Sequence, residues 1–124
     1  MPAPAPERAT ALDQILVFTL EGKELGMPIA PVIEILPYQG VTPVPRSSTL
    51  VEGILALRGR MVTVVDLRRT LAMSPRAPGA RSQVIVVDSA GDLLGLVVDS
   101  VARVDEAEAG VSPLDLERLI EEMA

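Results

Sequence analysis

The segment Leu55-Ala-Leu-Arg-Gly-Arg-Met-Val-Thr-Val-Val-Asp-Leu-Arg68 decides how this chain of 124 residues folds. Two apolar runs flank Arg58-Gly59, and glycine readily adopts the positive φ that a tight hairpin turn needs. The second run stops at Asp66, a good N-cap residue, so a helix is expected from Leu67 to Met73. The segment therefore predicts a strand over Leu50 to Leu57, a turn, a strand over Met61 to Val65, and a helix.

The rest of the chain repeats this alternation of short apolar runs and turns. The tripeptide Val-Val-Asp occurs three times, ending at Asp66, Asp88 and Asp99, and each copy indicates a buried strand that emerges into a turn. We also expect a short helical turn from Pro31 to Glu34, with proline at its first position. Many short strands with few helices indicate a small all-β barrel or sandwich, with further strands over Gln14–Leu20, Glu24–Met27, Gln83–Asp88 and Leu93–Val98.

The two ends of the chain differ from this pattern. Residues 1–11 form a leader rich in proline and alanine that we expect to be disordered. Ser112-Pro113-Leu114-Asp115 has the spacing of a helix capping box, and an apolar stripe follows it at helical spacing. The sequence thus predicts one domain over residues 12–124, with a C-terminal helix at about residues 113–123.

The composition excludes most catalytic mechanisms. The chain has no cysteine and no histidine, which removes thiol and imidazole nucleophiles, bases and metal ligands. Aromatic residues make up 2% of the chain, namely Phe18 and Tyr38, and the formal net charge is −6, so a nucleic-acid partner is not expected. No apolar run is long enough for direct membrane insertion. We expect no catalytic residue, cofactor or metal site.

Aspartates are the remaining candidates for chemistry. Asp88-Ser-Ala and Asp99-Ser-Val distantly resemble the loops of aspartic proteases, but both lack the glycine that lets two such loops approach closely. An aspartate-based hydrolase would need two of the Val-Val-Asp loops to converge, and we keep it as a remote alternative. Aspartate as a turn residue at the end of a strand is the simpler interpretation.

The best candidate for a binding residue is Arg58. A hairpin turn would hold its planar guanidinium at the surface, where it could grip a carboxylate of another protein. Charge is unevenly spread, because residues 46–81 hold seven arginines against Glu52 and Asp66 whereas residues 82–124 are strongly acidic. A basic middle beside an acidic end suits protein contacts or self-association.

Several ordered motifs are similar to those of the CheW family of chemotaxis coupling proteins. The similarity runs in register from about residue 12 to residue 104 and is more specific than any single motif. The matching motifs are the opening strand Ile15–Leu20, Val32-Ile-Glu-Ile35, Pro45 to Gly53, Ala56-Leu-Arg-Gly59, Val64-Val-Asp-Leu-Arg68 and Val97-Val-Asp-Ser-Val101.

The resemblance implies a fold and a set of partners. The fold would be a pair of small, intertwined, SH3-like five-stranded β-barrels, and the chain would not be an enzyme. Its partners would be the cytoplasmic tip of chemoreceptors and a CheA-type histidine kinase, within cytoplasmic receptor clusters. The resemblance places partner contacts at Val32, Glu34, Arg58 and Gly59, beside an apolar groove between the two barrels.

Two departures from the family pattern qualify these expectations. The motif asparagine is Ala56 here, and only residues 105–113 separate Val104 from the Leu-Asp-Leu-Glu helix motif, so a hairpin is missing and one barrel is incomplete. We expect receptor binding to remain and kinase binding to be weakened, as in the small CheW-like proteins of frizzy gliding-motility systems. A full coupling protein is the alternative. The exposed edge would be covered by the C-terminal helix, by a partner, or by strand or helix swapping in a homo-oligomer.

Overall fold

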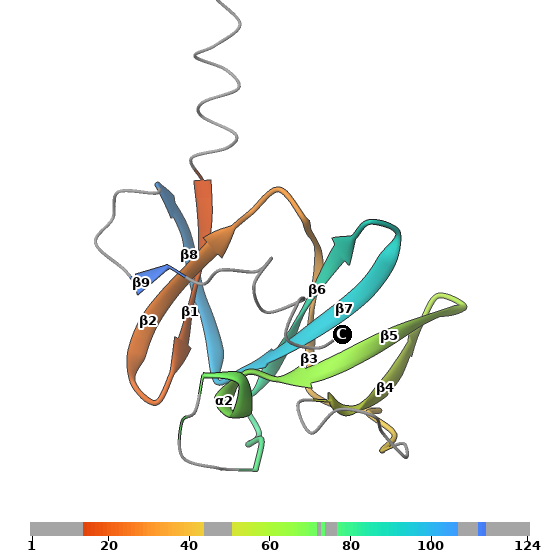
Figure 1. Ribbon diagram of the computed structural model, residues 1–124. Coiled ribbons are helices and arrows are strands. Elements are labelled where there is room, and N and C mark those ends of the chain that lie inside the picture. Colours follow the sequence, from red (N-terminus) through yellow and green to blue (C-terminus); the bar gives the residue numbers. More distant parts are fainter. Residues whose placement is uncertain (1–13, 44–50, 72, 74–76, 107–111, 114–124) are drawn as a thin grey trace, which may run out of the picture.

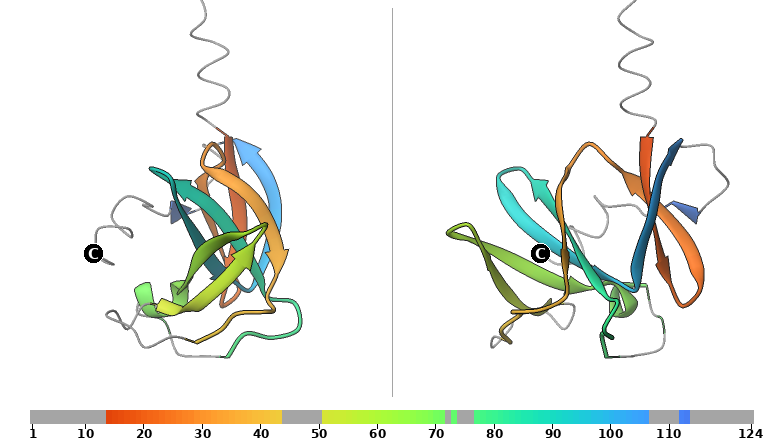
Figure 2. Two further views of the ribbon diagram at one scale, coloured as in Figure 1. Left: turned by 90° about the vertical axis from the view of Figure 1, so that its right-hand side faces the viewer. Right: turned by 180° about the vertical axis from the view of Figure 1, so that it is seen from behind.

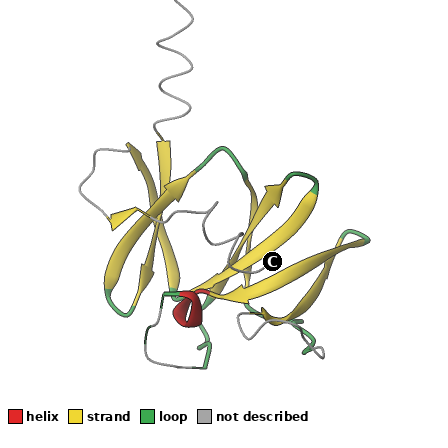
Figure 3. Ribbon diagram, in the orientation of Figure 1, coloured by secondary structure: helices red, strands yellow, loops and turns green. Residues whose placement is uncertain are grey.

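The described chain is built almost entirely of short β-strands (Figures 1 and 3). The structure is a computed structural model and describes residues 14–43, 51–71, 73, 77–106 and 112–113. The elements are β1 (Gln14–Leu20), β2 (Lys23–Pro28), β3 (Val32–Pro37), β4 (Val51–Leu57), β5 (Arg60–Asp66), α2 (Leu67–Thr70), β6 (Gln83–Ser89), β7 (Asp92–Val98), β8 (Ser100–Glu106) and β9 (Ser112–Pro113).

The strands form two sheets between which the chain passes twice. Sheet A has the order β8-β1-β2-β9, and sheet B has the order β3-β6-β7-β5-β4. Within the described residues, the chain starts in sheet A, builds all of sheet B, and returns to sheet A with β8, as the coloured ribbon shows in the view turned by 90° and in the view from behind (Figure 2). The two halves are therefore intertwined, and the expected mainly-β architecture of paired small barrels is confirmed.

Sheet B closes into a small barrel. Thr42 lies in the segment that follows β3 and exchanges two backbone hydrogen bonds with Ile54 of β4, at 2.8 and 2.9 Å. These bonds join the β3 edge of sheet B to its β4 edge. Gly53 permits this closure, because a Cβ atom there would lie 2.3 Å from the carbonyl oxygen of Thr42. Small apolar side chains fill the interior, in keeping with the scarcity of aromatic residues: Val62, Val64, Val84, Val86, Leu93 and Val97.

A second core lies between the two sheets. Phe18 and Met27 of sheet A are fully buried against the outer face of β6 and β7, where Ile85 and Leu96 are also fully buried. Full burial of one such side chain contributes about 1.5–3 kcal/mol, so this interface holds the two sheets together.

Sheet A repeats the arrangement of sheet B. The hairpin β1–β2 corresponds to β6–β7 residue by residue, so that Gln14 matches Gln83 and Gly26 matches Gly95. β8 pairs with β1 as β3 pairs with β6, and both pairs carry a bulge at the matching place. β9 runs parallel to β2 as β5 runs parallel to β7, but over two residues only. Within the described residues, sheet A has no counterpart of β4, so the described part of its barrel is open.

One local prediction is wrong. The segment from Pro31 to Glu34 is not a helical turn, because Val32 begins strand β3, which pairs with β6 along its length. The two prolines favoured a helical turn, and the pairing with β6 overrides that local preference. Asp66 does cap α2, and the helix ends at Thr70 rather than at Met73. The leader and the predicted C-terminal helix lie outside the described residues, except for Pro113, which belongs to β9.

Candidate functional site

The turn between β4 and β5 holds Arg58 at the surface. Arg58 and Gly59 both have positive φ, 51° and 81°, which is the two-residue turn that matches the twist of a β-hairpin. The hairpins β1–β2 and β6–β7 use the same turn, with a non-glycine residue followed by Gly22 or Gly91. The side chain of Arg58 is 71% exposed, so the turn presents a guanidinium to solvent as predicted from its sequence.

Arg58 and Glu34 form one site although they lie 24 positions apart in the sequence. Arg58 donates from Nη1 to Oε1 of Glu34 at 2.5 Å and from Nη2 to Oε2 at 3.2 Å. An exposed ion pair of this kind contributes little to stability, but its two parallel hydrogen bonds fix the orientation of the guanidinium. The hairpin turn and the middle of β3 therefore present a preorganised pair of charges.

The other two predicted contact residues differ in accessibility. Gly59 is exposed at the tip of the turn, whereas Val32 is only partly exposed and packs against the core between the sheets. Two neighbours of Val32 are more accessible, Ile33 at 47% and Ile35 at 36% exposure. Neither isoleucine was predicted from the sequence as a contact residue, although alternating exposure along a strand is the signal that identifies them once β3 is known to be a strand.

The apolar groove predicted between the two barrels can be traced only in part. Ile35 pairs with Ile85 and Val104 pairs with Leu16, so both lie on the faces that the two sheets turn toward each other. Both remain exposed, Val104 at 52%, whereas Ile85 and Leu16 are buried in the core. Exposed apolar side chains therefore border the inter-sheet core at β3 and at β8, where a partner could extend that core.

Two of the Val-Val-Asp copies converge, but an arginine lies between them. Asp66 accepts a hydrogen bond from the backbone N–H of Arg68, and Asp99 accepts one from its guanidinium at 2.6 Å. The hydrogen bond to Asp99 raises the pKa of Arg68. Asp99 thus pairs with a cation, whereas an aspartic protease needs two acids that share a proton.

The third copy is remote from this cluster. Asp88 lies at the β6–β7 turn, is exposed, and accepts a hydrogen bond from the backbone N–H of Gly91. All three aspartates thus have a structural role at the end of a strand, and nothing in this geometry favours the hydrolase alternative.

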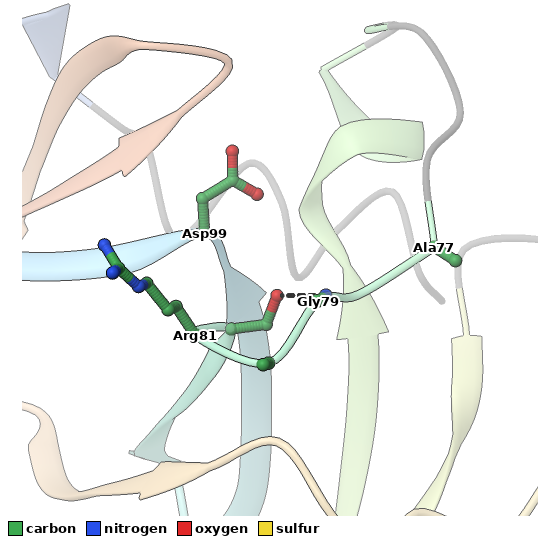
Figure 4. A pocket seen from close by; sticks show the side chains of 6 residues that line it. Ala77, Gly79, Arg81 and Asp99 are labelled. Carbon is green, nitrogen blue, oxygen red and sulfur yellow. Dashed lines mark hydrogen bonds between the residues drawn. The ribbon is translucent and has the colours of Figure 1, made fainter.

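A shallow depression of about 220 Å³ borders the same cluster (Figure 4). Asp99 reaches it from the end of β7 and Arg81 from the loop before β6, and Gly79 donates its backbone N–H to the Ser82 hydroxyl in its wall. Among the described residues, no group of three or more acidic side chains could hold a metal ion. Within the same part of the chain, no helix is long and apolar enough to cross a membrane.

Sheet A carries a second ionic cluster where its barrel is open. Arg103 of β8 donates to both carboxylate oxygens of Glu24, at 2.9 and 3.0 Å, and to Asp105 at 3.0 Å. These bonds lower the carboxyl pKa of Glu24 and of Asp105. In the internal repeat Glu24 corresponds to Leu93, an interior residue of barrel B, so a charged group stands at one interior position of this face. Val17, which corresponds to Val86, stays apolar and fully buried.

Comparison with known proteins agrees with this architecture. The family model of the CheW-like domain matches residues 14–121. The chain belongs to the CheW family. It is 34% identical over 95 residues to the chemotaxis protein CheW of Klebsiella aerogenes, and these residues make up 77% of this chain and 57% of that protein. It is 30% identical over 102 residues to the protein FrzA of Myxococcus xanthus, which covers 78% of this chain and 64% of that protein.

A solved CheW structure has the same fold. The crystal structure of the scaffolding protein TtCheW from Thermoanaerobacter tengcongensis superimposes with a TM-score of 0.72 at 31% identity, over 78% of this chain and 66% of that one. CheW-like proteins are scaffolds and adaptors rather than enzymes. The chain spans less than two thirds of the length of the Klebsiella and Myxococcus relatives.

Proposed function

We propose that this chain is a non-enzymatic chemosensory scaffold that binds the cytoplasmic tip of chemoreceptors and takes part in their signalling arrays. Membership of the CheW family supports the proposal most directly. The ion pair between Glu34 and Arg58 supports it further, because two positions associated with partner contact in the family meet at one exposed site. The neighbouring Ile33 and Ile35 add apolar surface of the kind that packs on a helical hairpin.

Contact with a CheA-type histidine kinase is proposed to be weakened or lost. The support is the open barrel of sheet A, in which the described residues supply no counterpart of β4 and only two residues of β9. A kinase domain that binds the complete barrel would meet the ion pairs of Arg103 with Glu24 and Asp105 at this place. In the cell, the protein would then sit in cytoplasmic receptor clusters without recruiting the kinase.

Paired binding measurements test the proposal. The purified chain is titrated against a receptor signalling fragment and, separately, against the regulatory domain of a CheA-type kinase, with a full-length CheW as the reference for both. We expect receptor binding within tenfold of the reference and kinase binding at least a hundredfold weaker. Equal affinity for both would establish the full coupling protein instead, and no receptor binding at high concentration would refute the scaffold proposal.

The contact role of Arg58 is tested by charge reversal. Arg58→Glu should weaken receptor binding by tenfold or more while the circular dichroism spectrum stays unchanged, because the exposed side chain contributes little to folding. Arg60→Glu is the matched control, since Arg60 lies two residues away, is also exposed, and donates to the backbone oxygen of Gly91 rather than to Glu34.

A double variant separates direct contact from preorganisation. Glu34→Arg combined with Arg58→Glu restores an ion pair but reverses its polarity. If it still fails to bind, the receptor reads the charges themselves; if it binds normally, the pair serves only to hold the turn in place, and direct contact through Arg58 is wrong.

A further inference from the structure

Arg68 is the most deeply buried charged residue of the described chain. It is 4% exposed, although charged residues are rarely buried to this extent without a partner. Its backbone belongs to α2, which follows β5 of sheet B and begins at the cap Asp66. Sheet B thus fixes the starting point of a long side chain that runs into the interior.

The guanidinium of Arg68 bonds to the opposite sheet. It donates to Glu21 at 2.8 Å, in the turn between β1 and β2, and to Asp99 at 2.6 Å, at the junction where the chain leaves β7 for β8. Oδ2 of Asp99 also accepts the backbone N–H of Glu21 at 2.9 Å. Figure 1 shows α2 beside the junction of β7 and β8. One carboxylate oxygen therefore joins the helix of sheet B to the hairpin of sheet A.

This ionic link exists on one side of the molecule only. In the internal repeat, Ala90 of the β6–β7 turn corresponds to Glu21, and Ala30 after β2 corresponds to Asp99. Alanine can accept no such bond from its side chain. Besides this link, the side chain of Gln83 in β6 accepts the backbone N–H of Val101 in β8 at 2.8 Å. The other described contacts in the core between the sheets are apolar packing, which specifies orientation less strictly than a two-partner guanidinium does.

We propose that Arg68 is a positioning residue that sets the orientation of sheet A relative to sheet B. A buried ion cluster recovers the cost of desolvation only in one arrangement, so it is better suited to specifying a geometry than to adding stability. Ile35 on β3 and Val104 on β8 border the core between the sheets, and Arg68 fixes their spacing. This role rests on the proposed function insofar as the receptor reads that spacing.

Distance measurements between spin labels test the role of Arg68. The chain has no cysteine, so introduced pairs can be labelled without side reactions. One pair of labels, at Lys23 in sheet A and Asp92 in sheet B, measures the distance between the two sheets. A control pair, at Gln39 after β3 and at Asp92, measures a distance within the barrel of sheet B. All three residues are exposed. Arg68→Met should at least double the width of the distance distribution across the sheets and leave the control distribution unchanged.

Further variants keep the test decisive. Arg68→Lys retains the charge and should narrow the distribution again in part, which a purely packing role would not produce. Where Arg68→Met does not fold, Glu21→Gln leaves Asp99 to pair with Arg68 and should broaden the distribution to a smaller extent. An unchanged distribution across the sheets in a folded Arg68→Met or Glu21→Gln variant would overturn the proposal.

Receptor binding by the same variants distinguishes this proposal from the proposed function. We expect Arg68→Met to bind a receptor signalling fragment at least tenfold more weakly than the unaltered chain, with partial recovery in Arg68→Lys. If the distance distribution across the sheets broadens in Arg68→Met but even the unaltered chain does not bind the receptor fragment, Arg68 is a positioning residue and the scaffold function is wrong. If the unaltered chain binds and Arg68→Met keeps both its distances and its affinity, the positioning role is wrong and the scaffold function stands.

Discussion

Gly53 and Gly95 occupy places in sheet B where a side chain would collide with its surroundings. A Cβ atom at Gly53 would lie 2.3 Å from a backbone oxygen of Thr42, and one at Gly95 would lie 2.7 Å from a methyl group of Val84. A methyl group can move by rotation of its side chain, whereas the backbone of Thr42 is held by two hydrogen bonds. The closure of barrel B therefore depends most strictly on Gly53.

Replacing Gly53 by alanine should destabilise the fold. We expect Gly53→Ala to lower the free energy of unfolding by about 1–3 kcal/mol, because overpacking forces the bridge between Thr42 and Ile54 apart. Urea unfolding followed by circular dichroism measures the change. Gly79→Ala is the control, since nothing lies within 4 Å of the added methyl group and its free energy of unfolding should hardly change. Equal effects of both variants would contradict this account of barrel closure.

Tyr38 provides a pH dependence with a defined sign. Burial and the hydrogen bond that its hydroxyl donates to Glu52 raise the pKa of Tyr38 to about 12. The unfolded chain, with a tyrosine pKa of about 10, then loses its proton first, so stability should fall as the pH rises from about 10 to 12.

Absorbance at 295 nm reports this ionisation without interference, because Tyr38 is the one tyrosine of the chain and tryptophan is absent. In Tyr38→Phe, the decrease in urea midpoint between pH 9 and pH 11 should be smaller than in the unaltered chain. The same decrease in both proteins would mean that other groups cause it.

At the scale of elements, sheet A carries an ionic cluster formed by Arg103, Glu24 and Asp105. Arg103 joins β8 to β2 through Glu24, and its hydrogen bonds lower the pKa of Glu24 and of Asp105. Glu24 is exposed at a position that is interior in barrel B, and an ionic cluster is a better surface there than leucine or valine for contact with water. The replacement is visible only when Glu24 is compared with Leu93 through the internal repeat.

Removing the arginine should raise the pKa of both acids. In Arg103→Gln, the carboxyl groups of Glu24 and Asp105 should titrate at higher pH than in the unaltered chain, because the guanidinium that stabilises their charged forms is gone. Carbon-detected NMR titration measures this, with Arg81→Gln as the control that leaves both values in place. Unchanged titration curves would mean that the cluster does not persist in solution.

At the scale of the whole molecule, the open barrel raises the question of self-association. β2 already pairs with β9 of the same chain. β8 carries a bulge opposite Val17 and Phe18 and bears charged residues, features that protect edge strands from pairing. These features favour a monomer over the swapped homo-oligomer that the shortened sequence also allows.

Light scattering after size-exclusion chromatography tests the state of association. We expect a mass close to 13.1 kDa, that of one chain, across a hundredfold range of concentration. A stable mass of two chains would instead show that a second copy covers the open edge, by swapping or by strand pairing.

The sequence alone established the hairpins, the start of α2 and the family, but not strands β3 and β8. X-Gly turns between apolar runs fix hairpins because only a few residues favour positive φ, and Asp66 fixes a helix start because its side chain caps the next N–H groups. For the same reason, the local pattern around Arg58 was enough to identify it as an exposed turn residue. Ordered motifs then carried the resemblance to CheW, and with it the paired-barrel fold.

Only the tertiary structure decided which distant residues meet. The pairing of β3 with β6 made a strand of a proline-flanked segment, brought Glu34 to Arg58, and left Ile33 and Ile35 exposed. The link from Arg68 to Glu21 and Asp99 likewise depends on the way the chain crosses between sheets. Such contacts form between residues far apart in the chain, so they depend on the order of strands in the sheets, which local propensity and periodicity do not encode.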